Sequence, residues 1–383
     1  MLKREGQWLE RENYVKLIQD KINSFKGGSE RFRNNILLLG QPKAGKTTVI
    51  KQILQNQKEI KSVYIDFNKL GLSPESFSIE FIGNICFNIL GKDKSDYKRF
   101  LDINHLLTLK NELSATAFGI IKLVENEVSK IKPNQRFLVE SALKFAEEIA
   151  AKNKFLVAME NIEAILDLNN FLQIKDVASI IKFNQRNVMY IATSSALTLA
   201  KNSFKDFENI DISNFNFSEM ESFLKILAVT DKKSIEKLHS LSNGNPYIAL
   251  CILKRDVHVK NIEKSFIAEL LEKDGLIYNY CCNCLENFLK RTSGHTLSKI
   301  ILKVIAFEEG LRLSEIASRI YRSAPVTKAL LERLIASDII YKKDGRYYFY
   351  DSVLRLWLKL IAIGYEIDDE ISEEKFDEVR KLL

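Results

Sequence analysis

The sequence predicts an α/β protein with a parallel sheet, followed by a helical segment and a small C-terminal domain. Three observations support this prediction. Over residues 35–212, short apolar runs that suit buried strands alternate with helical patterns. From residue 218 to residue 337, helical patterns follow one another without strands. Next come two β-rich arms around Asp344-Gly345, a dipeptide that is a strong hairpin signal.

The first strand is predicted over residues 35–39, and the loop that follows it organises the fold. Residues 40–47 fit the pattern G-x-x-x-x-G-K-[ST], and apolar residues over 48–54 are spaced for one face of a helix. A strand, this loop and a helix in that order predict a phosphate-binding loop. An incidental glycine-rich turn is the alternative, and both flanking segments argue against it.

Each position in the loop has a chemical task. Gly40 and Gly45 let a ligand approach the backbone and permit unusual dihedral angles. The start of the next helix adds partial positive charge and free N–H groups. Lys46 is expected to reach the β- and γ-phosphates, and the Thr47 hydroxyl to hold Mg²⁺. The predicted ligand is ATP, bound by Gly40, Gln41, Pro42, Lys43, Ala44, Gly45, Lys46, Thr47 and Thr48.

Further strands are predicted over residues 62–67, 155–159, 188–192 and 210–212. The second of these runs directly into Glu160 and Asn161, which is typical of a Walker B strand that places a carboxylate beside phosphate-bound Mg²⁺. The strand over 188–192 ends at Thr193, Ser194 and Ser195. We expect these polar side chains to sense the γ-phosphate or the attacking water.

The rest of the chain predicts three more parts. The division is 1–217 for the P-loop α/β domain, 218–291 for a helical lid, 292–360 for a winged helix and 361–383 for an acidic C-terminal helix. Three helical patterns before the hairpin indicate the winged helix. In the last part, Ser372 can cap a helix on which Phe376, Val379 and Leu383 share one face. That apolar face predicts a helix that docks back on the protein.

Composition limits the class of protein. The chain has 383 residues, of which 46% are hydrophobic and 28% charged, as in ordinary globular proteins. A net charge of +7 permits a nucleic-acid partner without requiring one, because 50 acidic residues offset 57 basic ones. No apolar run approaches the ~20 residues of a membrane span, and we expect a cytoplasmic protein. Cys281 and Cys284 form a C-x-x-C without a second pair, which favours a reduced helix over a zinc site.

The order of these parts resembles that of archaeal-type ATPases of the STAND class, which are related to AAA+ proteins and to archaeal origin-recognition ATPases. The resemblance covers residues 8–358. Its matching segments are residues 8–12 (WLERE), the phosphate loop, the strand ending at Thr193-Ser194, Gly244-Asn245-Pro246 and residues 351–358 (DSVLRLWL). It implies an ATP-controlled switch, and it places Arg11 and Pro246 near the adenine.

The chain departs from this family at the Walker B strand, which usually ends in Asp-Glu. Glu160 aligns with the Asp and Asn161 with the Glu, whereas a shift by one residue aligns Met159 and Glu160. One acid is missing in either alignment, and an Asn can orient a water but cannot accept its proton. Glu163 is a candidate substitute, although a solvated helix face is the favoured use. The catalytic candidates are Lys46, Glu160 and Asn161, and the Mg²⁺ candidates are Thr47 and Glu160.

Three functions are open at this point. The favoured one is a nucleotide-controlled switch with slow ATP hydrolysis; the others are a non-hydrolysing ATP-binding interaction module and an oligomeric working ATPase or loader. The winged helix offers basic residues that suit contacts to the phosphates of double-stranded DNA, namely Lys328, Arg333, Lys342, Lys343 and Arg346. Docking of a protein partner is equally open, because a modest charge excess only permits DNA binding.

Overall fold

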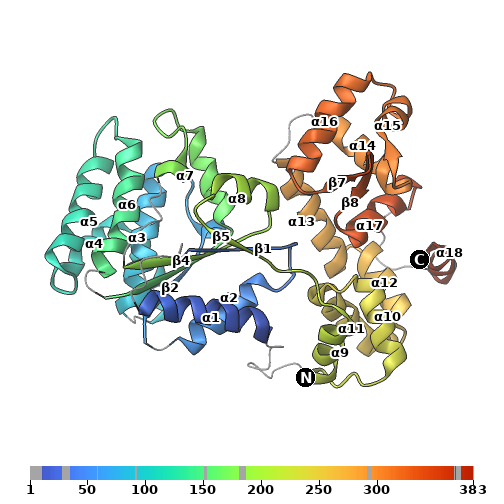
Figure 1. The fold of residues 1–383 in the computed structure, drawn as a ribbon, viewed down its shortest axis with the longest axis horizontal. Helices are drawn as coiled ribbons and strands as arrows, with labels where there is room; N and C mark the ends of the chain where they lie inside the picture. Colours follow the sequence, from blue (N-terminus) through green and yellow to red (C-terminus); the bar gives the residue numbers. More distant parts are fainter. Residues whose placement is uncertain are drawn as a thin grey trace.

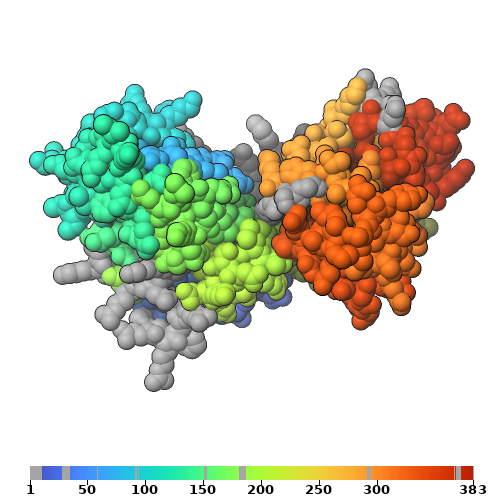
Figure 2. Space-filling model, turned by 90° about the horizontal axis from the view of Figure 1, so that it is seen from above, coloured from blue at the N-terminus to red at the C-terminus, as the bar shows by residue number. Residues whose placement is uncertain are grey.

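The computed structural model describes residues 11–27, 35–57, 59–90, 93–150, 153–180, 187–290, 295–365, 367 and 372–382. These residues form two lobes (Figure 1). The N-terminal lobe is built on a sheet, and the C-terminal lobe is mainly helical. Seen from above, the molecule narrows between the lobes (Figure 2). In this part of the chain, no helix is long and apolar enough to cross a membrane.

The N-terminal lobe contains a five-stranded parallel sheet in the order β2-β3-β4-β1-β5. The strands are β1 (Ile36–Leu39), β2 (Lys61–Asp66), β3 (Phe155–Glu160), β4 (Val188–Ser194) and β5 (Glu208–Asp211). This confirms the predicted α/β class and its parallel sheet. All five strands end at one edge of the sheet, the edge at which such sheets bind ligands.

Helices cover both faces of this sheet (Figure 1). Ile36 and Leu38 pack in one hydrophobic cluster with α1 (Glu12–Lys26) and α2 (Lys46–Asn56), whereas Leu37 and Leu39 belong to the cluster on the other face. A strand buried on both faces needs an unbroken apolar run, which explains the sequence of β1. The second face is covered by α3 (Pro74–Leu90), η2 (Lys94–Leu101), α4 (Ile103–Thr108), η3 (Leu109–Asn111), α5 (Ala115–Val128), α6 (Gln135–Ala150), η4 (Ile162–Asn170), α7 (Val177–Ile180) and α8 (Leu197–Ser203). The short η1 (Phe67–Lys69) follows β2.

The C-terminal lobe begins with five helices and continues into a small mixed module. The helices are α9 (Phe217–Ile226), α10 (Lys232–Ser242), α11 (Pro246–Val259), α12 (Ile262–Leu271) and α13 (Leu276–Lys290). The module contains α14 (His295–Phe307), β6 (Leu311–Arg312), α15 (Leu313–Arg319), α16 (Ala324–Ala336), β7 (Ile340–Lys343) and β8 (Arg346–Phe349). Its strands form a sheet in the order β6-β8-β7. The predicted hairpin is confirmed: β7 and β8 are antiparallel, and Asp344 and Gly345 both have positive φ at the turn.

One hydrophobic cluster extends through the whole C-terminal lobe, from Phe215 to Val379. It includes residues of α17 (Ser352–Ala362) and α18 (Glu373–Arg380). Phe376 and Val379 of α18 are buried, so the predicted docking of this helix on the protein is confirmed. It packs on α12, where Lys264 forms an ion pair with Glu373. Leu383 lies outside the described residues.

Residues 212–216 connect the two lobes, and a glycine from each lobe packs against this linker. A Cβ added to Gly40, in the loop after β1, would lie 2.3 Å from the Ile212 carbonyl oxygen. A Cβ added to Gly244 would lie 2.2 Å from the Phe215 carbonyl oxygen. Both distances are too short for any side chain, so these two glycines allow the linker to lie against both lobes.

Candidate functional site

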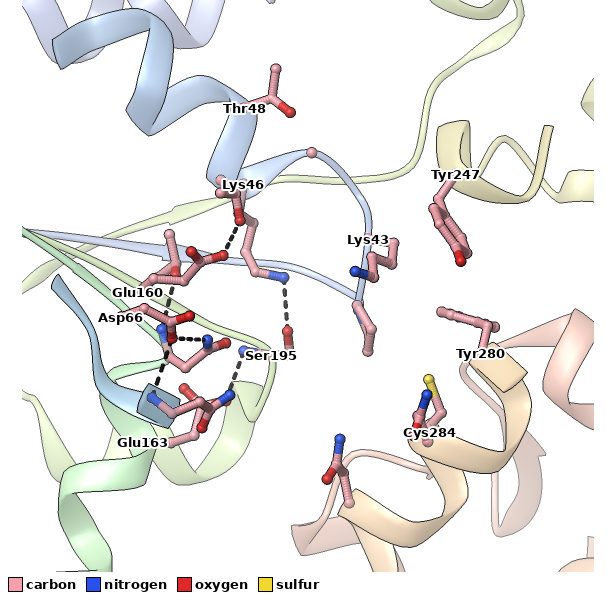
Figure 3. Close-up of a pocket in the computed structure, with 18 of the residues that line it drawn as sticks. Lys43, Lys46, Thr48, Asp66, Glu160, Glu163, Ser195, Tyr247, Tyr280 and Cys284 are labelled. Atoms are coloured by element: carbon pink, nitrogen blue, oxygen red, sulfur yellow. Dashed lines mark hydrogen bonds between the residues drawn. The ribbon is translucent and has the colours of Figure 1, made fainter. Parts of the chain in front are cut away.

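A cavity of about 1070 Å³ lies between the lobes, at the carboxyl edge of the parallel sheet. The phosphate loop and the ends of β2, β3 and β4 form one wall, and α11 and α13 form the opposite wall (Figure 3). The backbone turns into α2 at Gly45, which caps the helix with φ 103°. At that position an added Cβ would meet no described atom within 4 Å, so the loop is open to a ligand.

Lys46 is a buried cation at the phosphate-loop wall of the cavity. Its Nζ donates hydrogen bonds to the carbonyl oxygens of Gly40 and Gln41, each at 2.8 Å, and to Ser195 Oγ at 2.9 Å. Burial lowers its pKa to about 8, and the carboxylates of Glu163 and Glu160 oppose this decrease. A buried ammonium is costly unless it is compensated. It is therefore suited to an anion that enters the cavity.

The ends of β2 and β3 supply two of the acids of the site, Asp66 and Glu160. Thr47 Oγ1 donates a hydrogen bond to Glu160 Oε1 across the cavity wall. Asn161 has left-handed backbone geometry, and its Nδ2 donates to Asp66 Oδ1 at 2.9 Å. A hydroxyl and a carboxylate are oxygen ligands of the kind Mg²⁺ prefers, so Thr47 and Glu160 fit a magnesium ion beside the loop. Met159, the other residue of the shifted alignment, is buried in the core.

The end of β4 contributes two side chains to the cavity. Thr193 lines it and accepts a hydrogen bond from the Asn161 backbone N–H at 3.2 Å. Ser195 also lines it and binds Lys46, whereas Ser194 is fully buried and bonds to the backbone of Ala196. The sequence analysis named all three residues, and the structure brings Thr193 and Ser195 to the cavity but not Ser194. Side chains alternate along a strand, so Thr193 and Ser195 point the same way.

Arg11 lines the cavity where the linker and α11 meet. Its guanidinium lies 4.5 Å from the centre of the Phe215 ring and 5.5 Å from that of Tyr14. The residue is 5% exposed, and its Nε and Nη2 have no hydrogen-bond partner within the described part of the chain. Burial lowers the pKa of Arg11, whereas Glu219 and Tyr14 act to raise it. Two buried donors without acceptors are costly, so this corner fits a ligand that offers acceptors.

Most of the predicted site residues line this one cavity. They are Arg11, Pro42, Lys43, Gly45, Lys46, Thr47, Thr48, Glu160, Asn161, Thr193 and Pro246. Gly40, Gln41, Ala44 and Ser194 do not line it. Gln41 instead points to the C-terminal lobe, where its Nε2 donates to the Tyr350 carbonyl oxygen at 2.7 Å.

Helix α13 contributes residues that the sequence analysis did not identify. Asn279, Asn283 and Asn287 line the cavity with a spacing of four residues, which places them on one face of the helix. Cys284 also lines it, and burial raises the pKa of its thiol to about 12. The three asparagines at helical spacing were a usable signal. Their role depends on how the two lobes dock, which the local pattern does not contain.

The predicted DNA-contacting residues lie on the module rather than in the cavity. Lys342 and Lys343 are exposed on β7. On α16, Lys328 Nζ lies 3.8 Å from Glu332 Oε1. Arg333 is also on α16. Arg346 on β8 donates to the Gly310 carbonyl oxygen at 2.6 Å, so this side chain helps to hold the module together.

No protein-family model matches the chain, and no curated protein matches it in sequence. A solved structure, a Walker-type ATPase of Pyrococcus abyssi, is similar with a TM-score of 0.65 and 19% identity, over 93% of this chain and 97% of that one. Cdc6p of Pyrobaculum aerophilum matches with a TM-score of 0.41 and 10% identity, over 93% and 96% of the two chains. The Orc1 protein of Aeropyrum pernix, solved in complex with DNA, matches with a TM-score of 0.41 and 12% identity, over 98% of this chain and 94% of that one. The parallel sheet, its phosphate loop and the similarity to the Walker-type ATPase show that the chain has a P-loop NTPase fold.

Proposed function

We propose that the protein is a STAND-like ATPase that binds ATP between its lobes, hydrolyses it slowly and uses the nucleotide state to set the position of its C-terminal lobe. The observation that carries this proposal is the cavity itself. It combines a phosphate loop, a buried Lys46 and the Thr47–Glu160 pair within one site shared by both lobes.

The polar wall suits a triphosphate with Mg²⁺. Lys46 would neutralise phosphate oxygens, and Thr47 and Glu160 would hold the ion. When bound, Mg²⁺ supplies positive charge that stabilises the charge developing on the phosphates. The opposite corner suits the base, because Arg11 offers two donors that have no partner among the described residues, beside the apolar side chains of Phe215 and Pro246.

Direct contacts between the phosphate loop and the C-terminal lobe support the switch. Gln41 binds the Tyr350 carbonyl oxygen, and Asn245 Nδ2 donates to the Pro42 carbonyl oxygen at 3.3 Å. A ligand that reshapes the loop would therefore change bonds that hold the other lobe. A nucleotide shifts such an equilibrium only as far as its affinities for the two arrangements differ.

The test is to measure ATP affinity by calorimetry and steady-state turnover, with wild type and Lys46→Ala. We expect binding by wild type, turnover well below the typical ~10 s⁻¹ of enzymes, and an affinity reduced at least about tenfold by the substitution. Lys16→Ala, an exposed position on α1, is the control. Unchanged affinity in Lys46→Ala would contradict the site. Fast turnover would favour a working ATPase, and binding without turnover would favour an interaction module.

The module from α14 to β8 supports a second part of the proposal, a winged helix that contacts double-stranded DNA. Three helices pack with the β6-β8-β7 sheet, as expected for a winged helix. Lys342 and Lys343 project from its hairpin, and Tyr321, 88% exposed, stands beside Arg322 before α16. Exposed cations with aromatic neighbours suit phosphate contacts. A protein partner at the same surface is the alternative.

A further inference from the structure

Asp66, the last residue of β2, brings to the cavity a carboxylate that lies outside every motif in the sequence. It pairs with Glu160 in the parallel register of β2 and β3, and both residues line the cavity (Figure 3). Adjacent strands lie about 4.8 Å apart. The two acids therefore end neighbouring strands, and β3 is nearer than β2 to the strand that carries the phosphate loop.

The hydrogen bonds give the neighbouring residues different tasks. Glu160 accepts from Thr47 and is thereby held on the magnesium side of the site. Asn161 has φ 56° and ψ 49°, a conformation that Asn tolerates better than most residues. Its backbone N–H binds Thr193 and its side-chain amide binds Asp66. Asn161 therefore anchors Asp66, and its amide cannot accept a proton from water.

The two oxygens of Asp66 differ in their contacts. Oδ1 accepts from the Asn68 backbone N–H at 3.2 Å and from Asn161 Nδ2 at 2.9 Å. For Oδ2, the contact found among the described residues is Lys69 Nζ at 3.6 Å, on a side chain that is 74% exposed. The hydrogen bonds to Oδ1 hold the carboxylate in place, and Oδ2 is left to accept a proton.

We infer that Asp66 is the general base of ATP hydrolysis and that Asn161 positions it; this inference rests on the ATPase function proposed above. A water oxygen attacks the γ-phosphorus and forms the new P–O bond. The bond from the γ-phosphorus to the bridging oxygen breaks, and ADP leaves with its electron pair. The proton of the water passes to Asp66 Oδ2, so the products are ADP and phosphate. The base thus comes from β2 instead of the residue after Glu160.

Glu163, the substitute considered from sequence, has a different role in this arrangement. Its Oε1 accepts from the Ser195 backbone N–H at 3.3 Å, and Ser195 Oγ in turn binds Lys46. Among the groups that raise the pKa of Lys46, the Glu163 carboxylate has the largest effect. Glu163 therefore supports the lysine of the phosphate loop.

The test is single-turnover hydrolysis of Mg·ATP by Asp66→Asn. The amide keeps an oxygen acceptor for Asn68 and Asn161 but cannot take up a proton. Because general-base assistance contributes about 10²–10⁴-fold, we expect the rate constant to fall at least about 10²-fold while ATP affinity changes less than about threefold. The matched control is Asp211→Asn at the end of β5, where the carboxylate pairs with exposed Lys201, and it should retain the wild-type rate.

Two further variants separate a base from a structural role. Asp66→Glu restores a carboxylate and should recover part of the rate. The single-turnover rate constant should fall less in Asn161→Ala than in Asp66→Asn. An equal fall in both variants would show that Asp66 only holds Asn161 in place, and would overturn the inference. Hydrolysis within about threefold of wild type in Asp66→Asn would overturn the inference, and a large loss of rate in Glu163→Gln at unchanged ATP affinity would then assign the base to Glu163. A wild-type protein that binds no ATP would instead contradict the proposed function.

Discussion

At the scale of single residues, Gly244 shows how tightly the linker is held. Its φ is +70°, and an added Cβ would lie 2.2 Å from the Phe215 carbonyl oxygen. Gly244→Ala therefore combines strained backbone with a backbone clash, and we expect it to destabilise the protein by about 1–3 kcal/mol. Chemical denaturation followed by circular dichroism measures this loss.

Gly119 in α5 provides the matched control. An added Cβ there would meet no described atom within 4 Å, and the residue lies inside a helix. Gly119→Ala should stabilise the protein by about 0.5–1 kcal/mol, because glycine is a poor helix former. Equal effects of the two substitutions would contradict the close packing of the linker.

At the scale of elements, the N-terminus of α8 is capped from the other lobe. Asp338, which is 5% exposed, accepts from the Thr198 backbone N–H at 2.9 Å and from the Thr198 hydroxyl at 2.6 Å. A carboxylate at a helix N-terminus also interacts favourably with the helix dipole. This contact ties the module after α13 to the N-terminal lobe next to the cavity.

Asp338→Asn removes the charge and one acceptor but tolerates the positive φ of this position. Because the lobes would then separate more easily, we expect a fluorescent ADP analogue to dissociate several-fold faster in stopped-flow measurements. Asp344→Asn is the control, since Asp344 also has positive φ but lies at the tip of the hairpin. Unchanged dissociation in Asp338→Asn would show that this cap does not hold the lobes together.

The hairpin of β7 and β8 is the element that tests DNA binding. Lys342→Ala with Lys343→Ala should weaken binding to all duplexes alike and reduce the slope of log K against log salt by about 2, since each phosphate contact contributes about 0.9. Arg346 is left intact because it binds Gly310. The control replaces the adjacent exposed Lys232 and Lys233 of α10. If wild type binds no duplex even at low salt, the module is a docking site for protein.

The local elements were largely predictable, and their assembly was less so. The phosphate loop, the Walker B strand and the hairpin each have a signal within a few residues. Asp66 has none, because its place beside Glu160 depends on the order of the strands in the sheet. The bond of the Gln41 side chain to Tyr350 has no local signal either, because it depends on how the lobes dock. Such long-range relations exist only in the folded chain.

At the scale of the whole molecule, the last described helix, α18, packs on α12 of the C-terminal lobe. Phe376 and Val379 are buried, and Glu373 and Arg380 form ion pairs with Lys264 and Glu263 of α12. Deletion of everything after Tyr365 exposes this apolar surface, so we expect a melting temperature lower by several degrees. We expect unchanged DNA affinity, because the helix lies on α12 rather than on the basic hairpin. Tighter DNA binding at low salt would instead show that the acidic helix competes for that surface.

The continuous hydrophobic cluster of the C-terminal lobe has a mechanical consequence. Packed cores deform little, so a lobe with one core from Phe215 to Val379 would turn as a rigid lever about residues 212–216. The phosphate loop lies at this pivot, because the Gln41 side chain accepts a hydrogen bond from Asn214 of the linker and donates one to the Tyr350 carbonyl oxygen at the end of β8. A change in the conformation of the phosphate loop would thus act on the linker and on the C-terminal lobe at the same point (Figure 1). If the proposed switch operates, Gln41 is the fulcrum on which the lever turns.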